Sequence, residues 1–481
     1  MQPRVIQRVL GILLALFSIT MLPPALVSVL YRDAALLPFL GAFVITLATG
    51  MVMFLPVRNA EAKLRLRDSF VVVVGFWSVL GIVGSLPFLL YPELDRSVSS
   101  AIFESMSGLT TTGATAIVGL DNLPPSILFY RQQMQWLGGM GIIVLAIAIL
   151  PMLGIGGMQL YRAESSGPTK EKLTPRIAST AAALWYIYLG LTVACAIAYL
   201  LAGMSLFDAI GHSFSTVAIG GFSTHDASLG YFDNRAIEMI AVVFMLISGV
   251  NFALHFMAFR ARSFSNYKDD AEFKTYIKVL ATLTVITGFY LTWTNTASFR
   301  DSFLDGLFHV VSIGTTTGFT TREYFNWPGF LPVLLLYASF AGGCAGSTGG
   351  GMKVIRVMLL FKQGYRELVR MLHPNAKIVV KVGQRTMSNQ NIDVVWGFFA
   401  AYVVIFTVML LLMMATGLDQ TTAFSAVVAC LNNLGPGLGE VGLNYSTLSD
   451  FQLSVLSVAM LFGRLEIFTL LVLFTPAFWR K

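Results

Sequence analysis

The sequence predicts an all-α polytopic membrane protein, in which two N-terminal helices precede four similar units of span, short helix and span. Three observations predict this class. Of the 481 residues, 56% are hydrophobic and 12% are charged, and that charged fraction is about half that of a soluble protein. The apolar residues fall in blocks of about twenty, the length of a helix that crosses a bilayer. A glycine-bearing cluster recurs four times between these blocks.

Ten apolar windows are expected to form the membrane-crossing segments. They cover residues 5–30, 36–56, 69–91, 131–153, 183–203, 235–259, 274–294, 328–362, 393–416 and 452–478. The first window lies where a signal peptide would, but its length and the second window directly after it favour a retained helix. An even number of crossings places both termini on the same side of the membrane.

The placement of charge predicts which side that is. Most of the 32 Lys and Arg residues lie at the termini and in the connections 57–68, 160–178, 259–278 and 353–392. Because positively charged connections stay in the cytoplasm, both termini are expected to be cytoplasmic. The opposite side is rich in aspartate, which would concentrate cations at an outer mouth. Each single acid could equally be an ordinary solvated loop residue.

Four internal repeats follow the first two windows. The domains are therefore expected at 1–60 for the N-terminal helix pair and at 61–155, 175–262, 270–372 and 390–481 for the repeats, the third of which has a broken second span. Each repeat crosses twice and returns to its starting side, so the four copies are parallel and related by an axis along the membrane normal. This arrangement predicts a pseudo-fourfold central pore.

Each repeat carries one glycine at an equivalent position, namely Gly113, Gly221, Gly318 and Gly435. In the second repeat Gly220 is the alternative, but a phenylalanine follows both Gly221 and Gly318. Thirteen residues before each glycine stands a residue that is expected to cap a short helix: Ser100, Asp208, Asp305 and Thr422. Nine residues before the first three stand Glu104, His212 and His309. For the two histidines, packing and proton coupling are both open.

The segments that end in these glycines read TTTG, AIGG, TTTG and NNLG. Non-helical backbone at membrane depth is tolerated only inside protein or beside a watery cavity, and glycine lets successive carbonyls point the same way. Four such strands around one axis would form a ring of carbonyl oxygens that replaces the hydration shell of a monovalent cation. Helices that end at the ring would favour a cation through their dipoles. The alternative, tight turns under packed helices, does not predict four copies in register.

Two further features interrupt apolar windows. The run AGGCAGSTGGGMK at 341–353 would melt a helix at mid-membrane, and its spacing does not fit a phosphate-binding loop. Arg464 lies in the last window, where a buried charge is a functional hypothesis. Facing a pore, it would repel cations; a structural ion pair is the alternative. Glu466 could pair with a neighbouring segment, and Lys353 could be the cytoplasmic anchor of its helix.

Together these motifs resemble those of the membrane subunits of bacterial Trk-type potassium uptake systems, within the Trk/Ktr/HKT superfamily. The resemblance covers essentially the whole chain and is carried by residues 110–114, 218–222, 315–319, 432–437 and 340–353. It implies a homodimer in the lipid bilayer of the bacterial inner membrane. It also implies a cytosolic ring of TrkA-like nucleotide-binding regulatory subunits, and no nucleic-acid partner.

The resemblance further implies roles for individual residues. Gly113, Gly221, Gly318 and Gly435 would be the filter glycines. The carbonyl oxygens that bind potassium would be those of Thr111, Thr112, Ile219, Gly220, Thr316, Thr317, Asn433 and Leu434. The gate loop would comprise Gly342, Gly343, Gly346, Ser347, Thr348, Gly349, Gly350 and Gly351. Arg464 would be the pore barrier. In sodium-selective relatives the first filter glycine is serine, so Gly113 indicates potassium.

The expected function is therefore potassium translocation, with potassium as the transported ion and no organic cofactor in this chain. A symporter that couples potassium to sodium or protons on the same scaffold is the alternative. A membrane enzyme is not expected, because it would need clustered acids or histidines at one interface. The regulatory partner is expected to dock on 353–392 and to pull on the gate, so that neutralising Arg356, Lys362 and Arg366 should remove gating control while binding to the partner stays intact.

Overall fold

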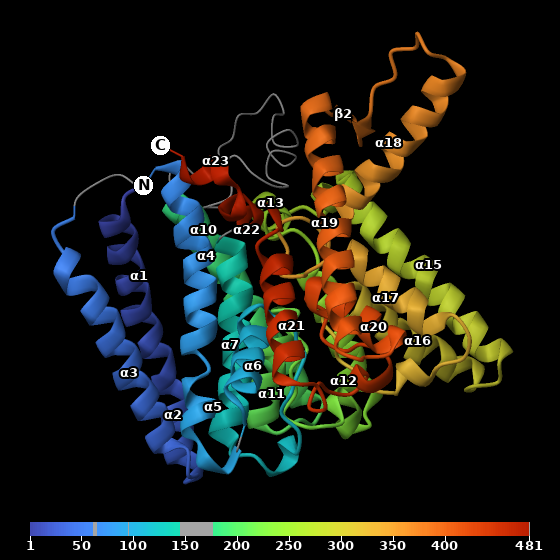
Figure 1. The fold of residues 1–481 in the computed structure, drawn as a ribbon. Coiled ribbons are helices and arrows are strands. Elements are labelled where there is room, and N and C mark those ends of the chain that lie inside the picture. The colour runs from blue at the N-terminus through green and yellow to red at the C-terminus, as the bar shows by residue number, and fades with distance from the viewer. Residues whose placement is uncertain (61–64, 95, 145–176, 481) are drawn as a thin grey trace.

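The computed structural model describes residues 1–60, 65–94, 96–144 and 177–480 (Figure 1). Its helices are α1 (Pro3–Ser18), α2 (Leu22–Tyr31), α3 (Leu36–Phe54), α4 (Leu66–Val83), α5 (Leu86–Leu90), α6 (Val98–Leu109), α7 (Pro125–Val144), α10 (Ile177–Leu201), α11 (Leu206–Val217), α12 (Arg235–Ser248), α13 (Phe252–Ala261), α14 (Ser265–Asp269), α15 (Ala271–Trp293), α16 (Phe299–Gly314), α17 (Leu331–Ala341), α18 (Val354–Leu372), α19 (Asn389–Ala415), α20 (Gln420–Leu431), α21 (Asp450–Arg464), α22 (Phe468–Leu471) and α23 (Pro476–Trp479). Short 3₁₀ turns join several of them.

An N-terminal helix pair forms one edge of the molecule (Figure 1). Helix α1 continues through a 3₁₀ turn into α2, and α3 packs back against α1. The two helices touch where Gly11 faces Gly50. A β-carbon on either glycine would lie 2.9 Å from the carbonyl oxygen of the other, which is the close approach that small residues allow between membrane helices.

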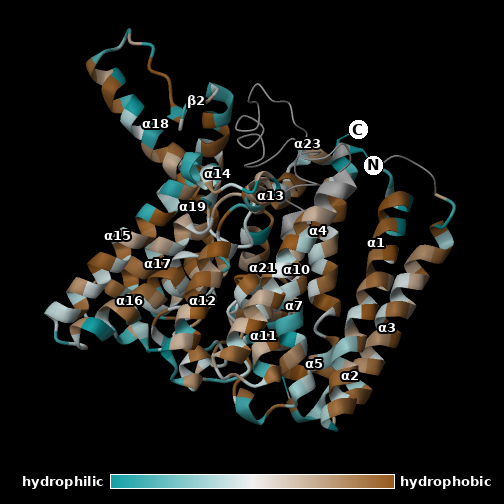
Figure 2. Ribbon diagram, turned by 180° about the vertical axis from the view of Figure 1, so that it is seen from behind, coloured by the Kyte–Doolittle hydropathy of each residue, from teal (hydrophilic) through white to brown (hydrophobic). Residues whose placement is uncertain are grey.

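Long apolar helices confirm the prediction of a polytopic membrane protein. In the described part of the chain, six stretches are long and apolar enough to cross a membrane, and two bent pairs add to them. Apolar side chains on the outer faces are exposed, as on Leu37, Phe289 and Leu411, and Figure 2 shows these faces in brown with hydrophilic residues gathered at the helix ends. These exposed apolar faces are the surface that lipid would cover.

Three expected spans are not single straight helices. Helices α12 and α13 bend by 90° at residues 249–251, and α21 bends by 108° before α22. The window 328–362 consists of α17, an irregular loop and α18. The expected span 131–153 begins as α7, and its last part lies outside the described residues, as does most of the basic connection 160–178.

Both chain termini lie at the same end of the molecule, in agreement with an even number of crossings (Figure 1). Helix α18 projects from that end and is followed by a small antiparallel pair of strands, β1 (Lys381–Val382) and β2 (Arg385–Thr386). Gly383, with φ of 57°, forms the turn between them. This hairpin is a minor departure from the all-α prediction.

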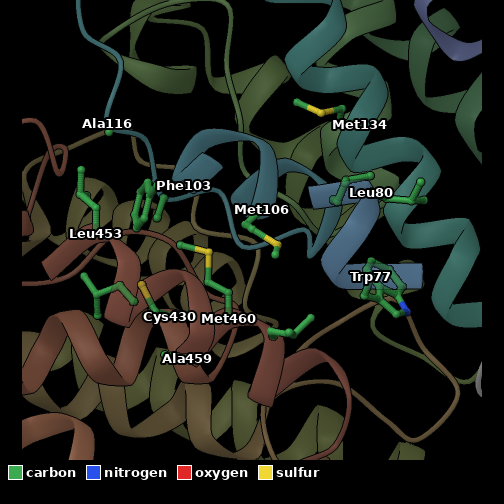
Figure 3. Close-up of a cluster of buried hydrophobic side chains, with 14 of the residues drawn as sticks. Trp77, Leu80, Phe103, Met106, Ala116, Met134, Cys430, Leu453, Ala459 and Met460 are labelled. Carbon is green, nitrogen blue, oxygen red and sulfur yellow. The ribbon is translucent and has the colours of Figure 1, made fainter. Parts of the chain in front are cut away.

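Four short helices, α6, α11, α16 and α20, form the centre of the fold, and we call them the inner helices. From their second turn onward most of their residues are buried. Figure 3 shows part of the surrounding core, where Phe103 and Met106 of α6 lie near Cys430 of α20 and Met460 of α21. The first and last repeats therefore share one apolar core, as neighbours around a closed arrangement would.

Candidate functional site: the ring of glycine segments and the adjoining loop

Each inner helix begins at a capping residue that the sequence did not single out. The side chains of Ser97, Ser205, Ser298 and Asp419 accept hydrogen bonds from the backbone three residues later. The expected caps Ser100, Asp208 and Thr422 are therefore wrong by one turn, since their own N–H groups donate to the true caps. The prediction that Asp305 caps a helix is also wrong, because Asp305 lies within the longer α16.

The C-terminal ends of the four inner helices share one backbone geometry. The N–H groups of Thr112, Gly220, Thr317 and Leu434 donate to the carbonyls five residues earlier, over 2.7–2.9 Å. The residue before each of them has a positive φ: 51° at Thr111, 55° at Ile219, 72° at Thr316 and 54° at Asn433. Such a left-handed residue ends a helix, but it is a genuine outlier for a β-branched side chain. Strain of this kind persists where the surrounding structure enforces it.

The four glycine segments, residues 110–113, 218–221, 315–318 and 432–435, close into a ring. A β-carbon built on Gly113 would lie 2.1 Å from the carbonyl oxygen of Gly220. For Gly221 the oxygen is that of Thr317 at 2.0 Å, and for Gly318 it is that of Leu434 at 2.2 Å. Gly435 completes the circle, because its β-carbon would lie 2.7 Å from the oxygen of Thr112. The four glycines are thus required by neighbouring backbone as well as by their positive φ of 80–100°.

Polar side chains from the inner helices hold the chain that leaves the ring. Glu104 accepts from the N–H of Ala116 at 2.9 Å, and the Nε2 atoms of His212 and His309 lie 2.9 Å from Ser223 Oγ and 3.2 Å from the carbonyl of Arg322. All three side chains are buried. In the fourth repeat Ser425 bonds both the N–H and the carbonyl of Leu438. These contacts favour the packing interpretation of the two histidines over proton coupling.

A buried arginine, ion-paired within the first repeat, joins that repeat to the second. Arg131 of α7 donates from Nε to Glu104 at 2.8 Å and from Nη1 to the carbonyl of Ser223 at 3.1 Å. Its guanidinium lies 4.2 Å from the ring centre of Phe222. This role of Arg131 was not predicted from the sequence, because its partners Glu104 and Ser223 are distant in the chain.

The loop between α17 and α18, residues 342–353, packs against the C-terminal ends of three inner helices. The N–H of Gly350 donates to Thr316 Oγ1 at 2.7 Å, and the N–H of Gly351 donates to the carbonyl of Asn432 at 2.9 Å. Thr348 Oγ1 donates to the carbonyl of Val217 at 3.1 Å. A β-carbon on Gly350 would lie 2.0 Å from that Asn432 oxygen. The glycines therefore let the loop lie directly against the ring.

Backbone bonds also tie the loop to neighbouring helices. The N–H of Cys344 donates to Gly249 at the break of α12, over 2.8 Å. Glu272 of α15 is buried and its Oε1 accepts from the N–H groups of Ala345 and Ile355, at 2.8 and 3.1 Å. The residues of the loop are small, but hydrogen bonds hold both of its ends.

Arg464 lies against this loop at the end of α21. It is 4% exposed, and its Nη1 and Nη2 donate to the carbonyls of Thr348 at 3.2 Å and Gly138 at 3.5 Å. Its Nε has no hydrogen-bond partner among the described residues. The ion pair in this region is formed instead by Glu466 and Arg356, at 2.6 Å. Arg464 is thus a buried cation held by neutral carbonyls.

The structure places three nearby cations away from open solvent, and one expectation about them is wrong. Lys353 is not a surface anchor, because it is 9% exposed and its Nζ donates to the carbonyl of Gly349 within the loop. Arg356 and Arg366 are also buried. Arg356 pairs with Glu466 and lies over the ring of Phe398. Neither arginine offers a free docking surface, and Lys362 is only half-buried but donates from its Nζ to the carbonyl of Lys381.

Together, the membrane-spanning fold, the backbone ring and the loop packed against it define the class: a polytopic membrane transport protein. The family model for TrkH, described as a cation transport protein, matches residues 37–481. The chain belongs to the TrkH family. As a member it is a transporter and not an enzyme.

Curated relatives and a solved structure resemble the chain along its whole length. It is 59% identical over 485 residues to the Trk system potassium uptake protein TrkH of Vibrio parahaemolyticus, covering 100% of both chains. It is 55% identical to TrkH of Escherichia coli K12 over 480 residues and 39% identical to TrkG of the same strain over 479 residues, with 99% of each chain covered. The crystal structure of the V. parahaemolyticus potassium transporter TrkH matches with a TM-score of 0.93 at 57% identity, covering 100% of both chains.

Proposed function

We propose that this protein carries potassium ions across the bacterial inner membrane, through a pore on the axis of the four glycine segments and into the cytoplasm, where both termini lie. The single observation that carries the proposal is the closed cycle of contacts from Gly113 through Gly221, Gly318 and Gly435. Relatives named as potassium uptake proteins support the choice of ion.

The backbone oxygens of the ring would replace water around the ion. The proposed ligands are the carbonyls of Thr111, Thr112, Ile219, Gly220, Thr316, Thr317, Asn433 and Leu434. Of these eight carbonyl oxygens, that of Gly220 alone accepts a hydrogen bond from another described residue. Since a carbonyl has two lone pairs, that oxygen can still face an ion. The C-terminal dipoles of the inner helices add negative potential at the same place.

The loop of Gly342, Gly343, Gly346, Ser347, Thr348, Gly349, Gly350 and Gly351 would be the gate. Its N–H groups donate hydrogen bonds to oxygens at the helix ends, including the carbonyl oxygen of Asn432. A cation that leaves the ring would otherwise meet these oxygens. Ions would pass when this loop moves aside and gives up those bonds. Its small side chains leave room for such a movement.

Arg464 would be the barrier at the same level. A cation held by the neutral carbonyls of Thr348 and Gly138 keeps its full charge. At a distance of about 10 Å and an effective dielectric of about 20, like charges repel by roughly 1–2 kcal/mol. Its bond to Thr348 would also help to hold the gate closed.

Regulation would come from the cytoplasmic end. We propose a homodimer that binds a ring of TrkA-like nucleotide-binding subunits through α18 and the hairpin. Exposed cations at that end, such as Arg370 and Lys377, can attract an acidic partner. A pull on α18 would reach the gate directly, because α18 begins immediately after the loop.

A symporter that couples potassium to sodium or protons is the second candidate, since the same ring of carbonyl oxygens would bind its potassium ion.

The test is ion flux into liposomes that contain the purified protein, with potassium, rubidium, sodium and lithium compared. The wild type should prefer potassium, and Gly113→Ser should lose that preference, because the new side chain would meet the Gly220 oxygen. An unaltered preference in this variant would refute the filter assignment. Accumulation of potassium beyond its electrical equilibrium would instead establish coupled symport.

A further inference from the structure

Gly220, next to the filter glycine of the second repeat, is a glycine whose backbone does not require one. It is absent from the positions with positive φ, so its backbone geometry is open to ordinary residues. The equivalent positions hold Thr112, Thr317 and Leu434. A reason other than backbone freedom must therefore exclude a side chain at 220.

The side chain of Gln135, from α7, occupies that space. A β-carbon on Gly220 would lie 2.4 Å from both Cδ and Oε1 of Gln135. The amide bonds the segment at two points, since Nε2 donates to the carbonyl of Gly220 at 2.6 Å and Oε1 accepts from the N–H of Phe222 at 3.0 Å. Gln135 is fully buried. Its amide thus bridges the backbone on both sides of Gly221.

The TTTG repeats hold the same stretch in another way. In the first repeat the hydroxyls of Thr110 and Thr112 lie 2.7 Å apart, and in the third those of Thr315 and Thr317 also lie 2.7 Å apart. The second repeat has Ala218 and Gly220 at these positions and therefore has no such hydroxyl pair. The fourth repeat also lacks it, and there Asn432 bonds Tyr402 and Ser339 from neighbouring helices.

We infer that Gln135 is a positioning residue for ion selection, which replaces the missing threonine pair and fixes the Gly220 carbonyl at its place in the ring. This inference rests on the proposed filter function. The amide of Gln135 takes one lone pair of that oxygen and leaves the other for the ion. Because the amide is itself buried and bonded at both ends, it holds the carbonyl at one distance from the axis. A larger or smaller ring would suit a different ion.

The test compares Gln135→Leu with Gln133→Leu in the full-length protein, by flux of potassium and sodium into liposomes. Gln133 is a buried glutamine of the same helix, but its amide donates to the carbonyl of Thr20 in the N-terminal pair, at 2.9 Å. Gln135→Leu should lower the potassium-to-sodium ratio about fivefold, the effect of one lost neutral hydrogen bond. Gln133→Leu should leave the ratio unchanged. Equal ratios in both variants would overturn the inference.

A second pair of variants removes the ambiguity of misfolding. Gly220→Thr alone should clash with Gln135 and damage selectivity, whereas Gly220→Thr combined with Gln135→Ala gives the threonine the vacated space and should recover part of it. Such coupling between neighbours is measured by a double-mutant cycle. A double variant no better than Gly220→Thr would refute the inference. If Gly113→Ser alters the potassium-to-sodium ratio while Gln135→Leu does not, the filter assignment is supported and only the positioning role of Gln135 is refuted. A wild-type protein without selectivity would refute both proposals.

Discussion

The ring and the loop packed against it differ in how often their geometry occurs. The ring repeats one helix end four times, with the same hydrogen bonds and the same pair of positive φ values. The loop occurs once, in the third repeat, and its companion Arg464 occurs once, in the fourth. Coordination of a small cation benefits from equivalent oxygens on all sides. Closing a passage needs only one movable segment.

This contrast shows that the ring and the loop are subject to different structural constraints. The four ring glycines tolerate no side chain, because backbone of the next segment lies where a β-carbon would be. The loop is held mainly by hydrogen bonds that can be exchanged for others, and it joins α18, which projects at the end of the molecule where both termini lie (Figure 1). The ring is therefore expected to be rigid and the loop to move. The following predictions test that division.

The largest effect is expected at the ring. Gly221→Ala should abolish selective potassium flux, because its β-carbon would lie 2.0 Å from the Thr317 oxygen. Overpacking of this kind costs roughly 1–3 kcal/mol, enough for a tenfold or larger loss. Gly119→Ala is the matched control, since Gly119 also has a positive φ, of 77°, but meets nothing within 4 Å. Equal flux loss in the two variants would show that backbone strain, and not ring closure, is the cause.

A substitution of the barrier residue Arg464 should change potassium flux in the opposite direction and by a smaller factor. Arg464→Ala should raise potassium flux by about tenfold, the equivalent of the roughly 1–2 kcal/mol of repulsion between like charges at this distance. Selectivity should stay as in the wild type, because the ring is untouched. The measurement is flux per protein in liposomes together with the ion ratio.

Arg464→Lys separates repulsion from loop release. Lysine keeps the charge but cannot reproduce the planar two-armed bonding of the guanidinium to Thr348 and Gly138. If repulsion sets the barrier, this variant should remain slow. Flux as high as in Arg464→Ala would mean that the residue acts by holding the loop.

The sequence predicted the ring better than its surroundings, for a physical reason. The glycine positions form a pattern that repeats within the chain itself, so their equivalence is visible without coordinates. The capping residues were missed because Ser97 and Ser100 are equally good caps, and the length of the buried helix decides between them. Gln135 was missed because its contacts with Gly220 join residues 85 positions apart.

The bends of α12 and α21 illustrate the same limit. Their windows are mostly apolar, so their composition and length predict one helix in each. The break at Gly249 instead follows from a distant segment, since its carbonyl accepts from Cys344 of the loop. At the second bend, Glu466 and Ile467 both have positive φ, of 52° and 55°, and Glu466 reaches Arg356 at the start of α18. Tertiary contacts there override local preference.

The smallest effect is expected at the contact between Asp121 of the first repeat and His225 of the second. His225 Nδ1 lies 2.5 Å from Asp121 Oδ1, its Nε2 lies 3.5 Å from Asp208 Oδ1, and its ring stacks on Tyr231. Burial alone would lower the pKa of His225, but the hydrogen bonds and charges of Asp208 and Asp121 outweigh it and raise the pKa above the ordinary 6.5. The contact thus joins the two repeats by a charge that depends on pH.

The sign of the pH dependence follows from that shift. Because the folded-state pKa is raised, the stabilisation is fully present below pH 6.5 and is lost as the pH rises through the raised value. Asp121→Asn should lower the melting temperature of the detergent-solubilised protein by about 1 °C at acidic pH, since partly exposed pairs contribute under ~1 kcal/mol. The difference from the wild type should vanish at alkaline pH. Flux should not change in either range if the ring is the rigid layer, so a pH-dependent change in flux in this variant would assign part of the gating to this contact.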